Sequence, residues 1–468
     1  MTYNFRSLVA GLDGEVPLLD GRTVPYVNLD NAASTPPLRA VIEALDGFMP
    51  WYSSVHRGTG YKSRLSTEAY EAARRQVAAF LGADPERDAV IFVKNATEGL
   101  NKLAQCLPLT EGRNVVITSW MEHHSNDLPW RAAAHTVHVD IDPLGRLDMD
   151  DLRAKLGRYR DSVAVVAVTG ASNVTGFINP IHEIARLAHE AGAYMALDAA
   201  QLAPHRPVDM KPAGDEGHID FAVIASHKMY APFGSGALVG PREVFEAGPP
   251  SVVGGGAVDL VSDDHVDWAA APEREEAGSP NVPGAVALAR AIQVLAGIGM
   301  DQVAQHEAEL VQYALRRLNK LPKVHVYGSR DPERTEDRVG VITFDVEGLH
   351  HALVAAVLAY EAGVGVRNGC FCAHPYVTRL KRVGPEEFAR IRSQVLRGDR
   401  TNAPGMVRAS FGLYNTTDDI DVFIEALERI CRGDIRGQYE FEPSVPSYEP
   451  RGFAWDPAER LPWLKEIR

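Results

Sequence analysis

The chain has 468 residues, 45% of them hydrophobic and 24% charged, which is typical of a globular protein with room for two domains. Its 48 basic and 62 acidic residues give a formal net charge of -14, and this argues against a nucleic-acid or anionic-membrane partner, because both would repel an acidic surface. With no apolar run near the ~20 residues of a membrane span, no long apolar stretch at the start and only four cysteines, we expect a cytoplasmic protein with free thiols and no membrane partner.

Short apolar runs alternate with helical stretches through the first half of the chain. Strands that are apolar throughout and are followed by helices predict a largely parallel sheet covered on both faces. In such a sheet, ligands bind beyond the carboxyl ends of the strands, so the loops after strands are where a site is expected. The predicted strands are residues 89–95, 114–120, 162–172, 193–200 and 218–226, and the predicted helices are 96–107 and 181–192, the latter ending at a glycine.

After about Gly284 the pattern becomes mixed. Helices are predicted over 285–299, 350–363 and 418–433, and strands over 324–328 and 339–346. The fold class is therefore α/β, with a large domain at 26–290 and a smaller α+β domain formed by 1–25 together with 291–434. Residues 435–468 are rich in Pro, Glu and aromatic residues without a clear period, and we expect an extended tail packed on the surface.

Residues of complementary chemistry follow several predicted strands. Asp198 closes one strand, Lys228 comes just after another, and His123 follows a third. The turn "KNATEGLN" opens a helix whose free N–H groups and Thr97 hydroxyl suit a phosphate. Each feature alone has an ordinary explanation, such as a helix cap or a solvated side chain. Together they supply a lysine for a Schiff base, an acid for a ring nitrogen, an aromatic ring for stacking and a phosphate site, which are the requirements of pyridoxal 5'-phosphate (PLP).

The order and the residues of these segments resemble those of one protein family. The motifs "NLDNAASTPP", "NATEGLN", "EHHSN", "DAAQ", "SHK" and "VRASFG" span most of the chain. They are similar to those of the class V aminotransferases, which are PLP-dependent enzymes of fold type I, and among these to cysteine desulfurases and selenocysteine lyases. The resemblance implies a PLP-dependent transferase fold, with a large domain of mostly parallel sheet and a smaller α+β domain.

The resemblance also implies roles for individual residues. Lys228 would bind PLP covalently, Asp198 would pair with the pyridinium nitrogen, and Gln201 would reach the ring hydroxyl. His123 would stack on the ring and relay protons. Asp198 must stay ionised, because only a protonated ring withdraws electrons well enough to stabilise a carbanion at the substrate Cα. The implied phosphate contacts are Ala96, Thr97, Ser226, His227 and, from the neighbouring subunit, Ser279; the implied substrate contacts are Ala32, Ala33, Asn173, Arg367 and Arg408.

The segment "RNGCFCAHP" fits the pattern Arg-x-Gly-x-x-Cys-Ala-x-Pro of desulfurases, with Cys372 at the nucleophile position. Gly369, Arg367 and His374 suit an exposed thiolate there. Cys370 is expected to be an inert thiol. A zinc site of Cys370, Cys372 and His374 is the alternative, but a fourth ligand and the usual two-residue gap are missing, so no metal is expected.

The resemblance implies a cysteine desulfurase, which converts L-cysteine to L-alanine and leaves a persulfide on Cys372 for transfer to a thiol, including that of a sulfur-acceptor protein. The alternatives are a PLP-dependent C–S lyase acting on a cysteine conjugate or related amino acid, and a sulfur-carrying or metal-binding scaffold without turnover. A homodimer is implied, with Ser279 and Asn281 reaching across the interface. Residues 379–405 look like an insertion with a basic helical segment, expected to form a lid or bind a partner.

Overall fold

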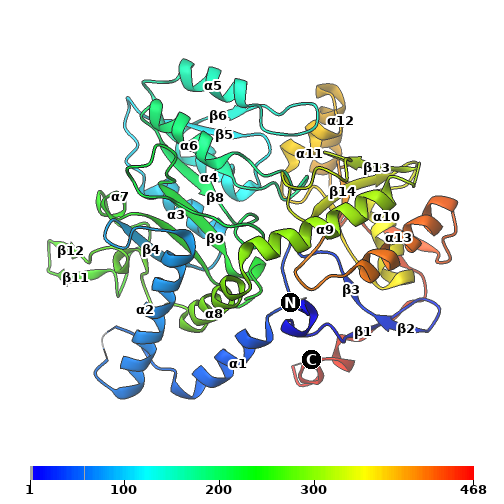
Figure 1. Cartoon of the computed structure of the whole chain (residues 1–468), viewed down its shortest axis with the longest axis horizontal. Coiled ribbons are helices and arrows are strands. Elements are labelled where there is room, and N and C mark those ends of the chain that lie inside the picture. The colour runs from blue at the N-terminus through cyan, green and yellow to red at the C-terminus, as the bar shows by residue number, and fades with distance from the viewer. Residues whose placement is uncertain (1–3, 57, 468) are drawn as a thin grey trace.

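The structure is a computed structural model that describes residues 4–56 and 58–467. A seven-stranded sheet forms the centre of its larger part, with the order β4-β10-β9-β8-β7-β5-β6 (Figure 1). The five strands from β9 to β6 run parallel, and β10 is antiparallel to both β9 and β4. This confirms the predicted largely parallel sheet. The strands are β4 (Asp88–Val93), β5 (Val115–Ser119), β6 (His135–Val139), β7 (Val163–Thr169), β8 (Tyr194–Asp198), β9 (Phe221–Ala225) and β10 (Gly236–Pro241).

Both faces of this sheet are covered, which explains why its strands are apolar throughout. Ile91 of β4 packs in the same buried cluster as Leu100, whereas its neighbour Val90 belongs to the cluster that contains Val77. Successive residues of a strand point to opposite faces, so both must be apolar. The helices of this part are α1 (Arg39–Phe48), α2 (Tyr61–Leu81), α3 (Ala96–Cys106), α4 (Leu128–Ala133), α5 (Met149–Arg158), α6 (Ile181–Glu190), α7 (Arg242–Glu246) and α8 (Val282–Ile298).

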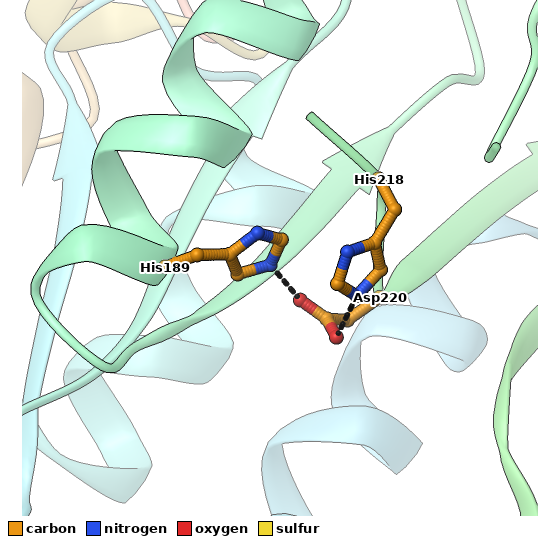
Figure 2. Close-up of side chains that lie close together, drawn as sticks. All are labelled: His189, His218 and Asp220. Carbon is orange, nitrogen blue, oxygen red and sulfur yellow. Dashed lines mark hydrogen bonds and ion pairs between the residues drawn. The ribbon is translucent and has the colours of Figure 1, made fainter. Parts of the chain in front are cut away.

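Helix α6 is tied to the amino ends of β8 and β9 by polar side chains. His189, in its last turn, hydrogen-bonds Asp220, which directly precedes β9, and His218 contacts the same carboxylate (Figure 2). Asp220 also accepts the backbone N–H of Met195 in β8. This cluster lies at the end of the sheet opposite the carboxyl ends of the strands.

The smaller part contains a four-stranded antiparallel sheet of order β13-β14-β17-β16, covered by helices on one side (Figure 1). Phe344 and Val407 lie in its buried core. The predicted α+β character is confirmed, whereas the domain boundaries at 26–290 and 291–434 stay a prediction. Its elements are α9 (Met300–Leu318), β13 (Val324–Tyr327), β14 (Val341–Val346), α10 (His351–Ala362), β16 (Arg367–Gly369), β17 (Met406–Ser410) and α13 (Thr417–Arg432), and beside them β3 (Val27–Asn28) pairs in parallel with β15 (Val364–Gly365).

Helices α8 and α9 connect the two parts. They meet at Gly299, whose φ of +93° is accessible mainly to glycine. Within the described ranges, no single helix is long and apolar enough to cross a membrane, and only the bent pair of α8 and α9, at 78°, meets the length and composition required.

The segment predicted as an insertion forms part of α11 (His374–Leu380) and all of α12 (Pro385–Leu396). Helix α11 is anchored to the large part, because the Arg379 guanidinium lies 3.8 Å from the centre of the Trp120 ring. Helix α12 is exposed along most of its length, with Ile391 as its buried residue. Its role as a lid or docking element stays a prediction.

The C-terminal tail contains more regular structure than its sequence indicated. Strands β18 (Tyr439–Glu442) and β19 (Ser447–Pro450) form an antiparallel hairpin, and β19 packs on α10. The rings of Phe441 and Tyr448 lie 4.8 Å apart, and both contact His350. Aromatic pairing across the two strands stabilises this short hairpin. The Pro-rich composition of the tail gave no sequence signal for these strands. Two further hairpins are formed by β1 (Glu15–Pro17) with β2 (Thr23–Pro25) and by β11 (Val258–Val261) with β12 (Val266–Trp268).

Candidate active site

A cavity of about 560 Å³ lies beyond the carboxyl ends of the central strands. Thr169, Asp198 and Ala225, the last residues of β7, β8 and β9, are part of its wall, as expected for a doubly wound sheet. Of the residues proposed from the sequence as catalytic, cofactor-binding or substrate-binding, all but Ser226 and Ser279 line this cavity. The residues that line it are Ala32, Ala33, Ala96, Thr97, His123, Asn173, Asp198, Gln201, His227, Lys228, Arg367, Cys372 and Arg408.

Lys228 stands at the end of a 3-10 turn that directly follows β9. Its Nζ donates a hydrogen bond to Oε1 of Gln201, at 3.2 Å. Burial lowers the pKa of Lys228 to about 8, and the negative charge of Asp198 opposes this shift. About a tenth of this amine is therefore uncharged and nucleophilic at pH 7, far more than for an ordinary lysine.

Asp198 is buried at the end of β8, and its Oδ1 accepts the N–H of Ala200 at 3.0 Å. Burial raises the pKa of this carboxyl, while the charge of Lys228 opposes the rise. A further cationic group beside Asp198 would favour its ionised form. Next to it, Nε2 of Gln201 is buried without a hydrogen-bond partner among the described residues. The cavity thus contains polar groups suited to a ligand that has both a cationic ring nitrogen and an acceptor oxygen.

His123 caps a short 3-10 turn with its own side chain. Its Nδ1 accepts the N–H of Ser125 at 3.1 Å, so the imidazole proton is carried by Nε2. Burial lowers the pKa of His123 to about 3, and the charge of Lys228 adds to this effect. The ring is therefore neutral at physiological pH and offers an Nε2–H donor.

Glu122, which the sequence analysis did not single out, holds this turn in place. Its carboxyl accepts hydrogen bonds from Ser119 Oγ at 2.5 Å and from Asn126 Nδ2 at 2.7 Å. Asn126 in turn accepts the indole N–H of Trp130 at 3.0 Å. Burial raises the pKa of Glu122 to about 8. The buried Glu122 carboxyl, held by these two hydrogen bonds, thus fixes the backbone that presents His123.

The amino end of α3 forms another wall of the cavity. Asn95 caps it by accepting the N–H of Glu98 at 3.0 Å, and Ala96 and Thr97 occupy the first turn. The Thr97 hydroxyl lies 2.7 Å from that of Ser125. Burial lowers the pKa of His227 to about 4 and keeps its ring neutral. Backbone N–H groups, two hydroxyls and an imidazole form a typical phosphate-binding arrangement.

Two residues proposed as phosphate contacts lie elsewhere. Ser226 is fully buried, and its hydroxyl bonds the carbonyl and the N–H of Ser235 in the following turn. It therefore fixes the turn between β9 and β10 instead of facing the cavity, and the prediction for Ser226 is wrong in this respect. Ser279 lines a different cavity, beside Tyr52 and Gly256, so it reaches no cofactor bound to its own chain.

Arg408 on β17 enters the cavity from the smaller part of the molecule. Its guanidinium donates to the carbonyl of Asn173 at 2.9 Å and to Oδ1 of Asp30 at 3.1 Å. The other oxygen of Asp30 lies 3.0 Å from the guanidinium of Arg367. Arg408 is 3% exposed, and its Nε has no partner among the described residues. Asp30 therefore aligns two arginines, and the sequence reasoning missed it because its partners are distant in the chain.

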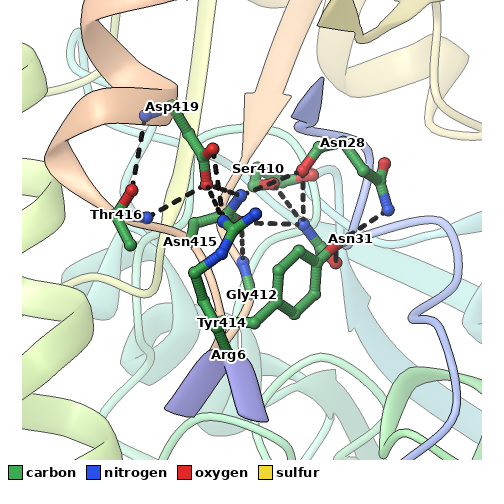
Figure 3. Close-up of polar contacts among 9 residues, drawn as sticks. All are labelled: Arg6, Asn28, Asn31, Ser410, Gly412, Tyr414, Asn415, Thr416 and Asp419. Atoms are coloured by element: carbon green, nitrogen blue, oxygen red, sulfur yellow. Dashed lines mark hydrogen bonds and ion pairs between the residues drawn. The ribbon is translucent and has the colours of Figure 1, made fainter. Parts of the chain in front are cut away.

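A polar network around Asn31 joins the segment that contains Asp30 to β17 and to the loop that follows it (Figure 3). Asn31 donates to the carbonyl of Ser410 at 3.0 Å and to the side chain of Asn415 at 3.2 Å. The N–H of Ala32 donates to the Ser410 hydroxyl at 2.9 Å. The motifs "NLDNAAS" and "VRASFG" thus form one surface of the site.

Cys372 lies on a loop with an uncommon backbone conformation, because Phe371 and Cys372 have φ values of +53° and +54°. Two contacts hold this loop: Asn173 Nδ2 donates to the carbonyl of Phe371 at 2.8 Å, and the backbone N–H of His124 donates to the carbonyl of Cys372 at 2.7 Å. Residues that follow strands of the central sheet therefore fix the position of the loop.

The side chain of Cys372 is exposed at the cavity opening. A thiolate there interacts electrostatically with Lys228 and Arg408. These are the features of an accessible sulfur nucleophile.

Cys370 also lines the cavity. Its Sγ lies 3.0 Å from Nε2 of His374, and the His374 ring stacks on that of His124 with centroids 5.0 Å apart. Burial raises the pKa of Cys370, which favours a protonated thiol. Cys370 therefore lies in the site, and its expected inertness stays a prediction.

The comparisons with known proteins agree with this geometry. The aminotransferase class-V family model matches residues 27–423. A cysteine desulfurase of Yersinia pseudotuberculosis is 36% identical over 87% of this chain and 93% of its own length, and a probable cysteine desulfurase of Halalkalibacterium halodurans is 36% identical over 88% and 95%. The solved structure of a cysteine desulfurase from Thermococcus onnurineus has a TM-score of 0.76 at 32% identity and covers 87% of this chain and 95% of that one. The chain belongs to the class V aminotransferase family, the family of these cysteine desulfurases.

Proposed function

We propose that this protein is a PLP-dependent cysteine desulfurase, which removes sulfur from L-cysteine, releases L-alanine and leaves a persulfide on Cys372. The observation that carries the proposal is one cavity lined by a half-buried lysine and a buried carboxylate, with an accessible cysteine and a buried arginine, Arg408, beside them. Desulfurases of comparable sequence support it.

The residues of the cavity fit PLP. The unpartnered Nε2 of Gln201 suits an acceptor oxygen, Asp198 suits a protonated ring nitrogen, and the amino end of α3 suits a phosphate. When bound, PLP withdraws electrons from the substrate Cα. Asp198 would stabilise the protonated ring by its charge, while Lys228 would hold the cofactor covalently.

The remaining chemistry belongs to side chains of this chain. Arg408 would bind the substrate carboxylate through its guanidinium, which Asp30 orients. Lys228, released as an amine, would take the proton from the substrate Cα and return a proton to the departing carbon skeleton, while the neutral ring of His123 would offer its Nε2–H as a hydrogen-bond donor to the reacting atoms. The Cys372 thiolate would attack the substrate sulfur, so that an S–S bond forms as the C–S bond breaks and alanine leaves.

Product analysis separates this function from a C–S lyase and from an inactive scaffold. The PLP-loaded protein is incubated with L-cysteine, and alanine, pyruvate and sulfide are quantified for the wild type, Cys372→Ala and the control Cys431→Ala, whose thiol lies outside the cavity. We expect alanine from the wild type and from the control, and its loss in Cys372→Ala. Pyruvate formed equally by all three proteins would establish the lyase, and no product at all would establish the scaffold.

A homodimer is also part of this proposal. The apolar residues Val253 and Leu260 are each 64% exposed and lie within two positions in the chain of Gly255 and Asp259, which line the cavity that contains Ser279. Apolar patches of this kind favour association, and Ser279 would then serve the partner subunit. A sulfur-acceptor protein and a cytoplasmic location, which suits the four free thiols, complete the proposal.

A further inference from the structure

His189, His218 and Asp220 form a compact cluster at the amino ends of β8 and β9, far from the candidate active site (Figure 2). Their side chains are 22%, 12% and 4% exposed, so the cluster is partly open to solvent. The two imidazole rings are stacked, with centroids 4.2 Å apart and planes at 22°. The proposed desulfurase chemistry uses none of these groups.

Every ring nitrogen in the cluster faces an oxygen that can only accept. Nδ1 of His189 lies 3.0 Å from the carbonyl of Glu216, and Nδ1 of His218 lies 3.0 Å from the carbonyl of Asp215. Nε2 of His189 lies 2.8 Å from one oxygen of Asp220, and Nε2 of His218 lies 3.0 Å from the other. The two histidines thus have the same pattern of contacts.

This pattern fixes the protonation of both rings. A carbonyl oxygen accepts but never donates, so both Nδ1 atoms carry a proton. In a neutral imidazole, Nε2 then has a lone pair that points at a carboxylate lone pair, which is repulsive. The contacts at Nε2 are attractive only if each ring is doubly protonated or if a cation lies between the nitrogens and the carboxylate.

The geometry favours a cation, because both rings anchor their Nδ1–H on a backbone carbonyl and turn Nε2 toward the same carboxylate. Two imidazolium rings stacked face to face, with centroids 4.2 Å apart, would repel each other. The guanidinium of Arg87, 3.4 Å from Asp220, adds a third positive charge around one carboxylate. One divalent ion satisfies both Nε2 atoms without adding a proton to either ring.

We propose that His189, His218 and Asp220 bind one Zn²⁺ ion, with water as its fourth ligand. Metal-binding histidines usually donate their second N–H to a carbonyl or a carboxylate, as both rings do here. Zn–N and Zn–O bonds of about 2.0–2.1 Å place ligand atoms about 3.3 Å apart in a tetrahedral site. Nε2 of His189 lies 2.8 Å from one oxygen of Asp220 and Nε2 of His218 lies 3.0 Å from the other, so binding one ion requires these contacts to widen and the carboxylate to turn. The ion would join the end of α6 to the start of β9.

The test is Zn²⁺ binding to the PLP-loaded protein at pH 8, measured by equilibrium dialysis. His218→Asn removes one ligand, and His265→Asn is the matched control, because His265 forms an exposed pair with Asp267, at 3.0 Å, outside the cluster. We expect His218→Asn to bind one Zn²⁺ fewer per chain than the wild type and the control, with unchanged alanine formation. Equal stoichiometry in all three proteins would overturn the proposal.

Arg87 gives a second, independent readout. Its positive charge opposes a cation at Asp220, so Arg87→Gln should tighten Zn²⁺ binding at this site. In Co²⁺-substituted protein, a visible d–d absorption should be present in the wild type and Arg87→Gln and absent in His218→Asn. If the cluster is only a set of protonated ion pairs, Arg87→Gln will leave Zn²⁺ affinity unchanged and no such absorption will be seen, and the proposal falls.

Discussion

At the scale of single residues, burial determines the chemistry of the site. It lowers the pKa of Lys228 to about 8, which makes a neutral, nucleophilic amine accessible near physiological pH, and it lowers that of His123 to about 3, which leaves a neutral hydrogen-bond donor. The sequence predicted these residues because each directly follows a strand. It did not predict Asp30, whose carboxylate orients Arg408 across a separation of 378 residues.

The shifted pKa of Lys228 predicts a pH dependence. The amine is protonated below about pH 8 and neutral above it, and only the neutral form attacks the aldehyde of PLP. The rate at which the apoprotein binds PLP covalently, followed by absorbance, should therefore rise through about pH 8 and then level off. A rate that shows its half-maximum near the ordinary lysine pKa of about 10.4 would contradict the burial of this amine.

Asp198→Asn should separate cofactor binding from turnover. The amide retains the size of the side chain but has no negative charge to keep the cofactor ring protonated, so we expect alanine formation to fall by about 10²-fold or more. The yellow colour of the bound cofactor should persist, which shows that the fold is intact. Turnover close to that of the wild type would mean that the charge at this position is not required.

At the scale of elements, the central strands were predictable and their surroundings less so. Strands buried on both faces are apolar throughout, and this signal is local in the sequence. The hairpin of β18 and β19 depends on contacts of Phe441 and Tyr448 with His350, which no local pattern contains. Ser226 illustrates the same limit. Its hydroxyl could bond either a ligand or the backbone, and the sequence does not show that the turn brings Ser235 within hydrogen-bonding distance of it.

Helix α13 offers a test of how the fold supports the site. Thr416 and Asp419 form a capping box at its start, and Asp419 also pairs with Arg6 at 3.1 Å (Figure 3). Thr416→Ala should lower the free energy of unfolding by about 1 kcal/mol, measured by urea denaturation. The neighbouring Thr417→Ala, on the exposed first turn, serves as the control and should have little effect. Equal losses in both variants would indicate a general effect of alanine and not the loss of the cap.

At the scale of the whole molecule, the proposed roles occupy opposite ends of one sheet. The cofactor cavity lies at the carboxyl ends of the strands, and the cluster of His189, His218 and Asp220 lies at their amino ends. The family, the α/β fold class and most cavity residues were predictable, because the motifs are specific and strand ends converge at one edge. The arrangement of subunits in the proposed homodimer would depend on surfaces that no motif describes.

The proposed homodimer can be tested at one exposed position. Val253→Asp places a charge in the apolar patch beside the cavity of Ser279 and should shift the protein from dimer to monomer in analytical ultracentrifugation. Val445, which is equally exposed at 63% but lies in the C-terminal hairpin, provides the control Val445→Asp and should remain dimeric. A wild type that sediments as a monomer would refute the dimer.

The most direct test of the account is to locate the sulfur after a single turnover. The PLP-loaded protein is mixed with less than one equivalent of L-cysteine, its thiols are alkylated, and its peptides are identified by mass spectrometry. We predict one additional sulfur atom on Cys372 and none on Cys106, Cys370 or Cys431, in an amount equal to the alanine released. Alanine formed without sulfur on Cys372, or with sulfur on another cysteine, would contradict the account.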